Sequence, residues 1–160
     1  MIDFAESIRG FNRLYKLPVP PSPELPKTRA ETVDRLRKFK AILIEEINEV
    51  DDIILQIEDG SPTPLATLTD IADWLGDIQV YCASEMTKYG LENDMILDII
   101  MASNMSKLGA DGQPIYDERG KVCKGPNFFP PESLIRQYIQ AFARQFLRAQ
   151  DAGNQDSLAL

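Results

Sequence analysis

Acidic residues recur at helical spacing in the stretch 42–54, which reads ILIEEINEVDDII. Ile42, Glu46, Glu49 and Ile53 follow steps of four, three and four residues. On a helix they form one line that is apolar at its ends and acidic in its middle. Because the same segment carries an apolar stripe, the two glutamates lie at the border of a buried face.

A second acidic line occurs in a segment that is otherwise apolar. Asp70, Asp73 and Asp77 follow steps of three and four residues. The short connection 60–63 makes the two helices antiparallel neighbours, which brings Asp70 and Asp73 opposite the two glutamates of the first line. Like charges about 4 Å apart repel by roughly 4 kcal/mol at an effective dielectric constant near 20. Four such carboxylates therefore require protons or a bound cation.

Oxygen ligands with room for water and phosphate are what Mg²⁺ prefers. The chain contains no histidine, and no cysteine lies on the two acidic lines, so zinc is disfavoured. We therefore predict a Mg²⁺ site formed by Glu46, Glu49, Asp70 and Asp73, with Mn²⁺ as a substitute. The alternative is that these carboxylates are solvated surface. That alternative suits a single Glu-x-x-Glu pair better than two acidic lines on adjacent apolar helices.

Capping signals divide the chain into helices. Good N-terminal caps stand at Asp3, at Thr28 with Glu31, at Thr63 before Pro64, and at Asn93. The predicted helices span residues 3–15, 28–60, 63–90, 93–109 and 130–152, with a small β-hairpin at 114–124. The sequence thus predicts an all-α fold, an antiparallel bundle of about five helices. We expect one domain over residues 1–152 and a flexible tail over 153–160.

Composition excludes several classes of function. The formal net charge of −8 and the sequence pI near 4.6 argue against non-specific binding to nucleic acid or anionic lipid. No apolar run approaches the roughly 20 residues that span a bilayer. The two cysteines show no pairing pattern and no secretory leader is apparent, so we expect a cytoplasmic protein.

Groups that suit phosphate follow the acidic helices. Asn104 and Lys107 lie three residues apart on one helix face, and the stretch 120–131, GKVCKGPNFFPP, adds Lys124 and an aromatic residue, Phe128. Amide and ammonium groups together suit a phosphate chain that Mg²⁺ partly neutralises. The alternatives are that Lys107 only complements the helix dipole and that the phenylalanine packs the hairpin onto the bundle.

Three motifs in order, EEINE (45–49), DIAD (70–73) and NMSK (104–107), resemble those of the all-α nucleoside triphosphate pyrophosphohydrolases. That superfamily includes MazG-like enzymes, dimeric dUTPases and phosphoribosyl-ATP pyrophosphohydrolase. The resemblance covers about residues 28–131. Glu46, Glu49 and Asp73 match the family pattern of Glu-x-x-Glu followed by Glu-x-x-Asp, and Asp70 replaces a glutamate. Asp77 also resembles the last position of the MazG-type motif, but Trp74 would then replace the glutamate, so we prefer Asp70 and Asp73.

The resemblance implies Mg²⁺-dependent hydrolysis of a nucleoside triphosphate at the α-phosphorus, which releases a monophosphate and pyrophosphate. It implies Glu45 as the general base, and Asn104, Lys107 and Lys124 as phosphate ligands. Trp74, Tyr81 and Phe128 are candidates for contacting the base, with packing in the core as the alternative for each. Family members form dimers or tetramers, and we expect a homodimer.

Two other functions remain open from sequence. The first keeps the metal site but takes phosphoribosyl-ATP as the substrate. The second, from another class, is a non-catalytic helical module whose acidic line meets a basic partner. Dependence on Mg²⁺ separates this module from both enzymes.

Overall fold

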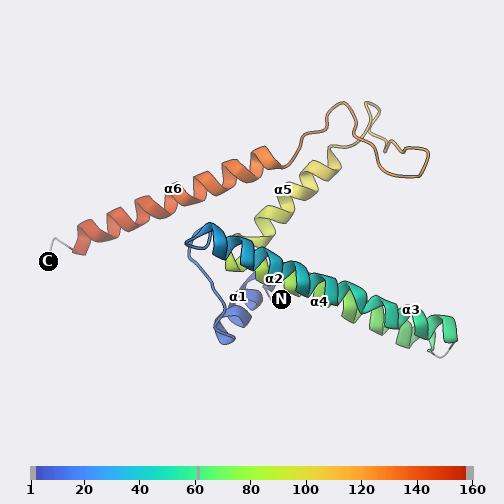
Figure 1. Ribbon diagram of the computed structural model, residues 1–160. Helices are drawn as coiled ribbons and strands as arrows, with labels where there is room; N and C mark the ends of the chain where they lie inside the picture. Colours follow the sequence, from blue (N-terminus) through green and yellow to red (C-terminus); the bar gives the residue numbers. More distant parts are fainter. Residues whose placement is uncertain (1–2, 61, 158–160) are drawn as a thin grey trace. The chain divides into compact units, whose positions relative to one another are not determined.

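The computed structural model describes residues 3–60 and 62–157, with side chains through residue 148. The chain divides into two compact units, residues 1–90 and 91–160. Unit 1 contains helices α1 (Phe4–Leu14), α2 (Arg29–Asn48), α3 (Val50–Asp59) and α4 (Pro64–Lys88). Unit 2 contains α5 (Asn93–Met105) and α6 (Glu132–Ser157) (Figure 1). The all-α prediction is confirmed, whereas one domain over residues 1–152 stays a prediction.

The predicted caps position the helices of unit 1. The Asp3 carboxylate accepts a hydrogen bond from the Glu6 backbone N–H at 3.1 Å, and Thr28 and Glu31 form the reciprocal capping box. The hydroxyl of Thr63 accepts from the Ala66 N–H at the start of α4. Local sequence therefore fixes where α1, α2 and α4 begin.

The predicted helix over residues 28–60 is two helices, so the expected number of about five becomes six in the described chain. The break lies at Glu49, whose backbone N–H donates to the Glu46 carbonyl at 3.3 Å. This bond spans three residues instead of four, which marks a locally tightened turn. The tightened turn coincides with the acidic line that the sequence singles out.

Helix α4 is the element against which the other helices of unit 1 pack. Its strongest polar link to α1 joins Asn12, which is 0% exposed, to Ser84. The Asn12 amide donates to the Ser84 carbonyl at 3.1 Å and accepts from the Ser84 hydroxyl at 2.7 Å. The Asn12–Ser84 pair fixes the position of α1 along the axis of α4.

Replacing Asn12 by alanine should lower the stability of the protein by about 2 to 3 kcal/mol, because the buried Ser84 hydroxyl loses its acceptor and the Ser84 carbonyl loses its donor from α1. The midpoint of thermal unfolding, followed by circular dichroism, should fall by roughly 4 to 12 °C. Asn48→Ala, at an exposed position at the end of α2, is the matched control and should stay near wild type. Equal midpoints for both variants would contradict the proposed contribution of the Asn12–Ser84 link.

Unit 2 corrects two predictions. The hairpin at 114–124 forms a single antiparallel bridge between Tyr116 and Val122, and no strand occurs in the part of the chain that the structure describes. The Asp117 carboxylate accepts hydrogen bonds from the backbone N–H groups of Arg119 and Lys121. These bonds hold residues 117–121 in a turn, which leaves little chain for paired strands. Helix α5 has Glu92 as its cap position, not Asn93, and ends at Met105 instead of 109.

Candidate functional site

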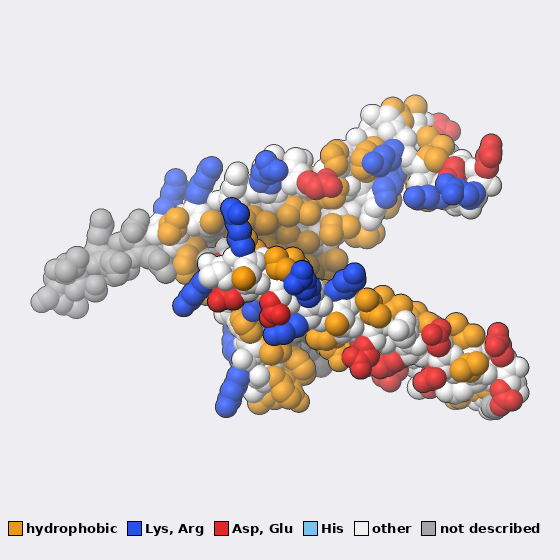
Figure 2. Space-filling view, viewed as in Figure 1, with side chains coloured by type: hydrophobic (Ala, Val, Ile, Leu, Met, Phe, Trp, Pro, Cys, Tyr) orange, Lys and Arg blue, Asp and Glu red, His pale blue; other side chains and the backbone are white. Residues whose placement is uncertain are grey.

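Charges of carboxylates on α2 and α4 act on Glu49 at the tightened turn. Glu46 is buried, 8% exposed, whereas Glu45 and Glu49 are exposed. The pKa of Glu49 is raised, first by the charge of Glu46, then by burial and by the charges of Asp77, Glu45 and Asp52. Figure 2 shows acidic side chains gathered over α3 and the adjoining end of α2. Negative charge is therefore concentrated where the sequence predicts a cation.

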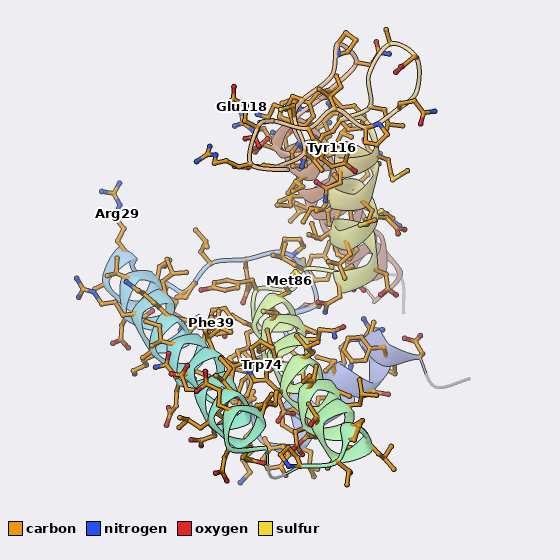
Figure 3. The ribbon with its side chains drawn as sticks, turned by 90° about the vertical axis from the view of Figure 1, so that its right-hand side faces the viewer. Arg29, Phe39, Trp74, Met86, Tyr116 and Glu118 are labelled. Atoms are coloured by element: carbon orange, nitrogen blue, oxygen red, sulfur yellow. The ribbon has the colours of Figure 1, made fainter. Side chains whose placement is uncertain are left out.

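Two aromatic side chains of α4 hold Glu46 in place. The Trp74 indole N–H donates to the Glu46 carbonyl at 2.8 Å, and Figure 3 shows Trp74 between α4 and α2. The Tyr81 hydroxyl donates to the Glu46 carboxylate, and this bond is the largest cause of the raised pKa of Tyr81. Trp74 thus joins the two helices, while Tyr81 orients a predicted metal ligand.

Asp77 is the α4 carboxylate whose charge acts on Glu49 and on Tyr81. Asp70 is half-buried and Asp73 is exposed, and neither is among the charges that raise the pKa of Glu49. The sequence prediction preferred Asp70 and Asp73, although the MazG-type motif that ends at Asp77 (LGD, residues 75–77) was the signal that pointed to it. No three Asp, Glu or Cys side chains in the described chain converge closely enough to hold a metal ion.

The predicted phosphate ligands lie in unit 2 and are near one another. The Lys107 ammonium donates to the Asn104 side-chain oxygen at 2.7 Å, so the two side chains meet, although Lys107 lies beyond the end of α5 and not on its face. The Lys107 carbonyl accepts from the Gly125 N–H at 3.0 Å. Next to that contact, the Lys124 ammonium lies 4.5 Å from the centroid of the Phe128 ring. An amide, two ammonium groups and an aromatic face thus belong to one region.

Two serines that the sequence analysis missed hold this region together. The buried Ser103 donates to the Phe129 carbonyl at 2.8 Å, and the Phe129 N–H donates to the Ser106 hydroxyl at 3.1 Å. A Cβ atom on Gly125 would overlap the Leu108 carbonyl, so the loop passes close to the end of α5. The repeated serine in SNMS was the available signal.

Comparisons with known proteins leave the family open. No protein-family model matches the chain, and no curated protein matches it. Similar solved structures include a crystal structure from Exiguobacterium sp. 255-15 described as a "putative NTP pyrophosphohydrolase". The two share 20% sequence identity over 94% of this chain and 99% of that chain, with a TM-score of 0.48. At this level, the similarity by itself assigns no function.

No helix in residues 3–60 and 62–157 is both long enough and apolar enough to span a bilayer.

Proposed function

We propose that this protein is a Mg²⁺-dependent nucleoside triphosphate pyrophosphohydrolase. The observation that carries the proposal is that the charges of Glu46 and Asp77, from α2 and α4, both act on Glu49 and raise its pKa. Repulsion between these carboxylates destabilises the protein without a cation. A bound cation offsets this repulsion, because it attracts every carboxylate that surrounds it. The order of the three sequence motifs supports the same reaction class.

The donor set fits a hard divalent cation, because every candidate ligand offers oxygen. Glu46, Glu49 and Asp77 would hold Mg²⁺, and Asp73, one turn before Asp77, would complete the set together with the predicted Asp70. No three of these groups converge in the described chain, so binding of the cation requires them to move together. When bound, Mg²⁺ neutralises phosphate charge and lowers the pKa of water.

The remaining residues have roles that follow from their positions. Glu45 precedes the first ligand, is exposed, and can accept a proton from the attacking water. Tyr81 keeps the Glu46 carboxylate oriented through its hydroxyl. Within unit 2, taken by itself, Asn104, Lys107 and Lys124 offer donors of the kind that phosphate oxygens accept, and Phe128 offers a ring face.

Self-association is part of the proposal. Aliphatic side chains that are 44 to 65% exposed occur along α2, α3 and α4 of unit 1, namely Ile44, Ile47, Ile54, Leu68 and Leu75. Isolated exposed apolar residues are ordinary, but a series along packed helices is typical of an association surface. A homodimer would bury this surface.

Pyrophosphate release should occur with Mg²⁺ and disappear with EDTA. We would measure it over ribo- and deoxynucleoside triphosphates and phosphoribosyl-ATP, and identify the monophosphate product. Preference for phosphoribosyl-ATP would establish the alternative substrate. Folded protein that releases no pyrophosphate from any of these compounds would contradict the proposal and favour the non-catalytic acidic module.

A further inference from the structure

Two donors of α4 hold a single residue of α2. The Trp74 indole N–H donates to the Glu46 backbone carbonyl at 2.8 Å, and Figure 3 shows Trp74 where the two helices face each other. The Tyr81 hydroxyl donates to the Glu46 carboxylate. Glu46 is buried, Trp74 is half-buried and Tyr81 is partly exposed. The neighbouring helix therefore holds Glu46 at both its backbone and its side chain.

The direction of the helices explains why both donors reach one residue. Arg35, early in α2, donates to the Lys88 carbonyl at the end of α4. Glu46, late in α2, meets Trp74 in the first half of α4, so the two helices are antiparallel. In a helix, carbonyls point toward the C-terminus and side chains tilt toward the N-terminus. The Glu46 carbonyl therefore points toward Trp74, and its carboxylate points toward Tyr81.

Asp77 lies between the two donors on the same helix. Trp74, Asp77 and Tyr81 follow steps of three and four residues, which place them on one face of α4. The donors are two turns, about 10 Å, apart, and Asp77 lies one turn from each. Because Trp74 and Tyr81 both hold Glu46, they bring Asp77 to the level of Glu46. The action of both carboxylates on Glu49 agrees with this placement.

The indole bond also coincides with the break between α2 and α3. In an uninterrupted α-helix, a carbonyl accepts from the N–H four residues later. The Glu46 carbonyl accepts from the Glu49 N–H, three residues later, and from the Trp74 indole. A side-chain donor that enters the ladder of backbone bonds is a common cause of such interruptions. Trp74 therefore stabilises the tightened turn that separates two proposed ligands, Glu46 and Glu49.

We propose that Trp74 and Tyr81 are positioning residues of the cation site, which fix Glu46 opposite Asp77, and that Trp74 also holds the turn that presents Glu49. Both act through Glu46, which gives them a role other than contact with a base. The inference rests on the proposed function, because the residues that they position are the proposed Mg²⁺ ligands. Loss of either donor should weaken cation binding about tenfold, as loss of a group that orients a metal ligand does.

The role of the indole N–H can be tested without changing the shape of the side chain. The chain contains one tryptophan, so an analogue incorporated in place of tryptophan changes only Trp74. Benzothienylalanine has sulfur in place of the indole N–H, so it keeps the packing and loses the hydrogen bond. Mn²⁺ binding to the full chain, followed by electron paramagnetic resonance without nucleotide, should weaken about tenfold. A fluorotryptophan that keeps the N–H is the matched control and should bind Mn²⁺ as the wild type does.

Tyr81→Phe removes the second donor and keeps the ring. It should raise the Mg²⁺ concentration needed for half-maximal pyrophosphate release and leave kcat at saturating Mg²⁺ near wild type. Tyr116→Phe, the same change at an exposed position in unit 2, should leave both quantities unchanged. Because both donors hold Glu46, Tyr81→Phe in the benzothienylalanine protein should weaken Mn²⁺ binding by less than the product of the two single losses.

The metal-free protein offers a readout that needs neither a variant nor catalysis. The indole N–H of Trp74 gives one signal in a proton–nitrogen correlation spectrum, because the chain has no other tryptophan. Its bond to the Glu46 carbonyl should slow its exchange with water, and added Mg²⁺ should shift its signal. Fast exchange with water in the metal-free protein overturns the role of Trp74.

The outcomes separate this inference from the proposed function. Mn²⁺ binding that benzothienylalanine and Tyr81→Phe both leave unchanged overturns the positioning role and keeps the metal site. A loss of kcat at every Mg²⁺ concentration, with unchanged Mn²⁺ binding, also overturns it, since that pattern indicates packing alone. Absence of Mn²⁺ binding by the wild-type protein contradicts the proposed function, and the positioning role falls with it.

Discussion

Replacing Glu49 by glutamine is expected to reduce Mg²⁺-dependent pyrophosphate release by about a thousandfold or more. Glu49 is the carboxylate on which the charges of Glu46 and Asp77 act, so it lies at the centre of the proposed cation site. A metal ion contributes several kcal/mol to stabilising a transition state at phosphorus, and each 1.36 kcal/mol corresponds to tenfold in rate. Steady-state kinetics over a range of Mg²⁺ concentrations measures the loss.

The same substitution should stabilise the protein in metal-free buffer at neutral pH. Because the folded-state pKa of Glu49 is raised, the folded protein binds a proton there more readily than the unfolded chain. The wild-type protein therefore loses stability as pH rises from the usual glutamate pKa through the raised value. Glutamine carries no charge, so its thermal midpoint should exceed that of the wild type at pH 7.5 and the difference should shrink near pH 4.5.

A control and a contrary outcome define this test. Glu58→Gln changes the same groups at an exposed position on α3 and should keep wild-type activity. Mg²⁺ should raise the thermal midpoint of the wild type and of this control but not that of Glu49→Gln. Full activity of Glu49→Gln, together with an unchanged response to Mg²⁺, would contradict the metal site.

Much of the local structure could be predicted because the determining interactions are close in sequence. Asp3, Thr28 and Thr63 each satisfy an N–H two or three residues into their own helix. Gly60 ends α3 with φ of 71°, a conformation that glycine adopts without strain. Asn104 and Lys107, three residues apart, meet through a side-chain hydrogen bond for the same local reason.

The tightened turn at Glu49 could not be predicted, because no glycine or proline marks it. Helix α2, which ends at this turn, packs on α4. The Trp74 indole N–H of α4 donates a hydrogen bond to the Glu46 carbonyl. Such a contact depends on tertiary structure, which overrides local propensity.

The choice between aspartates depended on the position of α4 along the axis of α2, which sequence spacing leaves undetermined. Asp70, Asp73 and Asp77 share one line, so any of them satisfies an antiparallel pairing with α2. The contact of Trp74 with Glu46 fixes how far α4 extends along α2. At that position, the charge of Asp77 reaches Glu49.

Asp77→Asn should therefore reduce kcat/KM by about a hundredfold or more, whereas Asp70→Asn should cost less than tenfold. Asp77 acts directly on Glu49, but Asp70 lies seven residues earlier, about 10 Å along the same helix. Asp73→Asn, one turn from Asp77, should have an intermediate effect. The three substitutions are isosteric, and thermal midpoints measured without metal would detect unequal damage to the fold.

The Mg²⁺ dependence of the rate makes this comparison decisive. Loss of a metal ligand should raise the Mg²⁺ concentration needed for half-maximal activity, whereas loss of a distant surface charge should leave that midpoint nearly unchanged. A raised midpoint for Asp77→Asn with a wild-type midpoint for Asp70→Asn supports Asp77 as a ligand. The reverse pattern would restore Asp70 and Asp73 as the ligand pair, and it would mean that α4 shifts along α2 by about two turns when the cation binds.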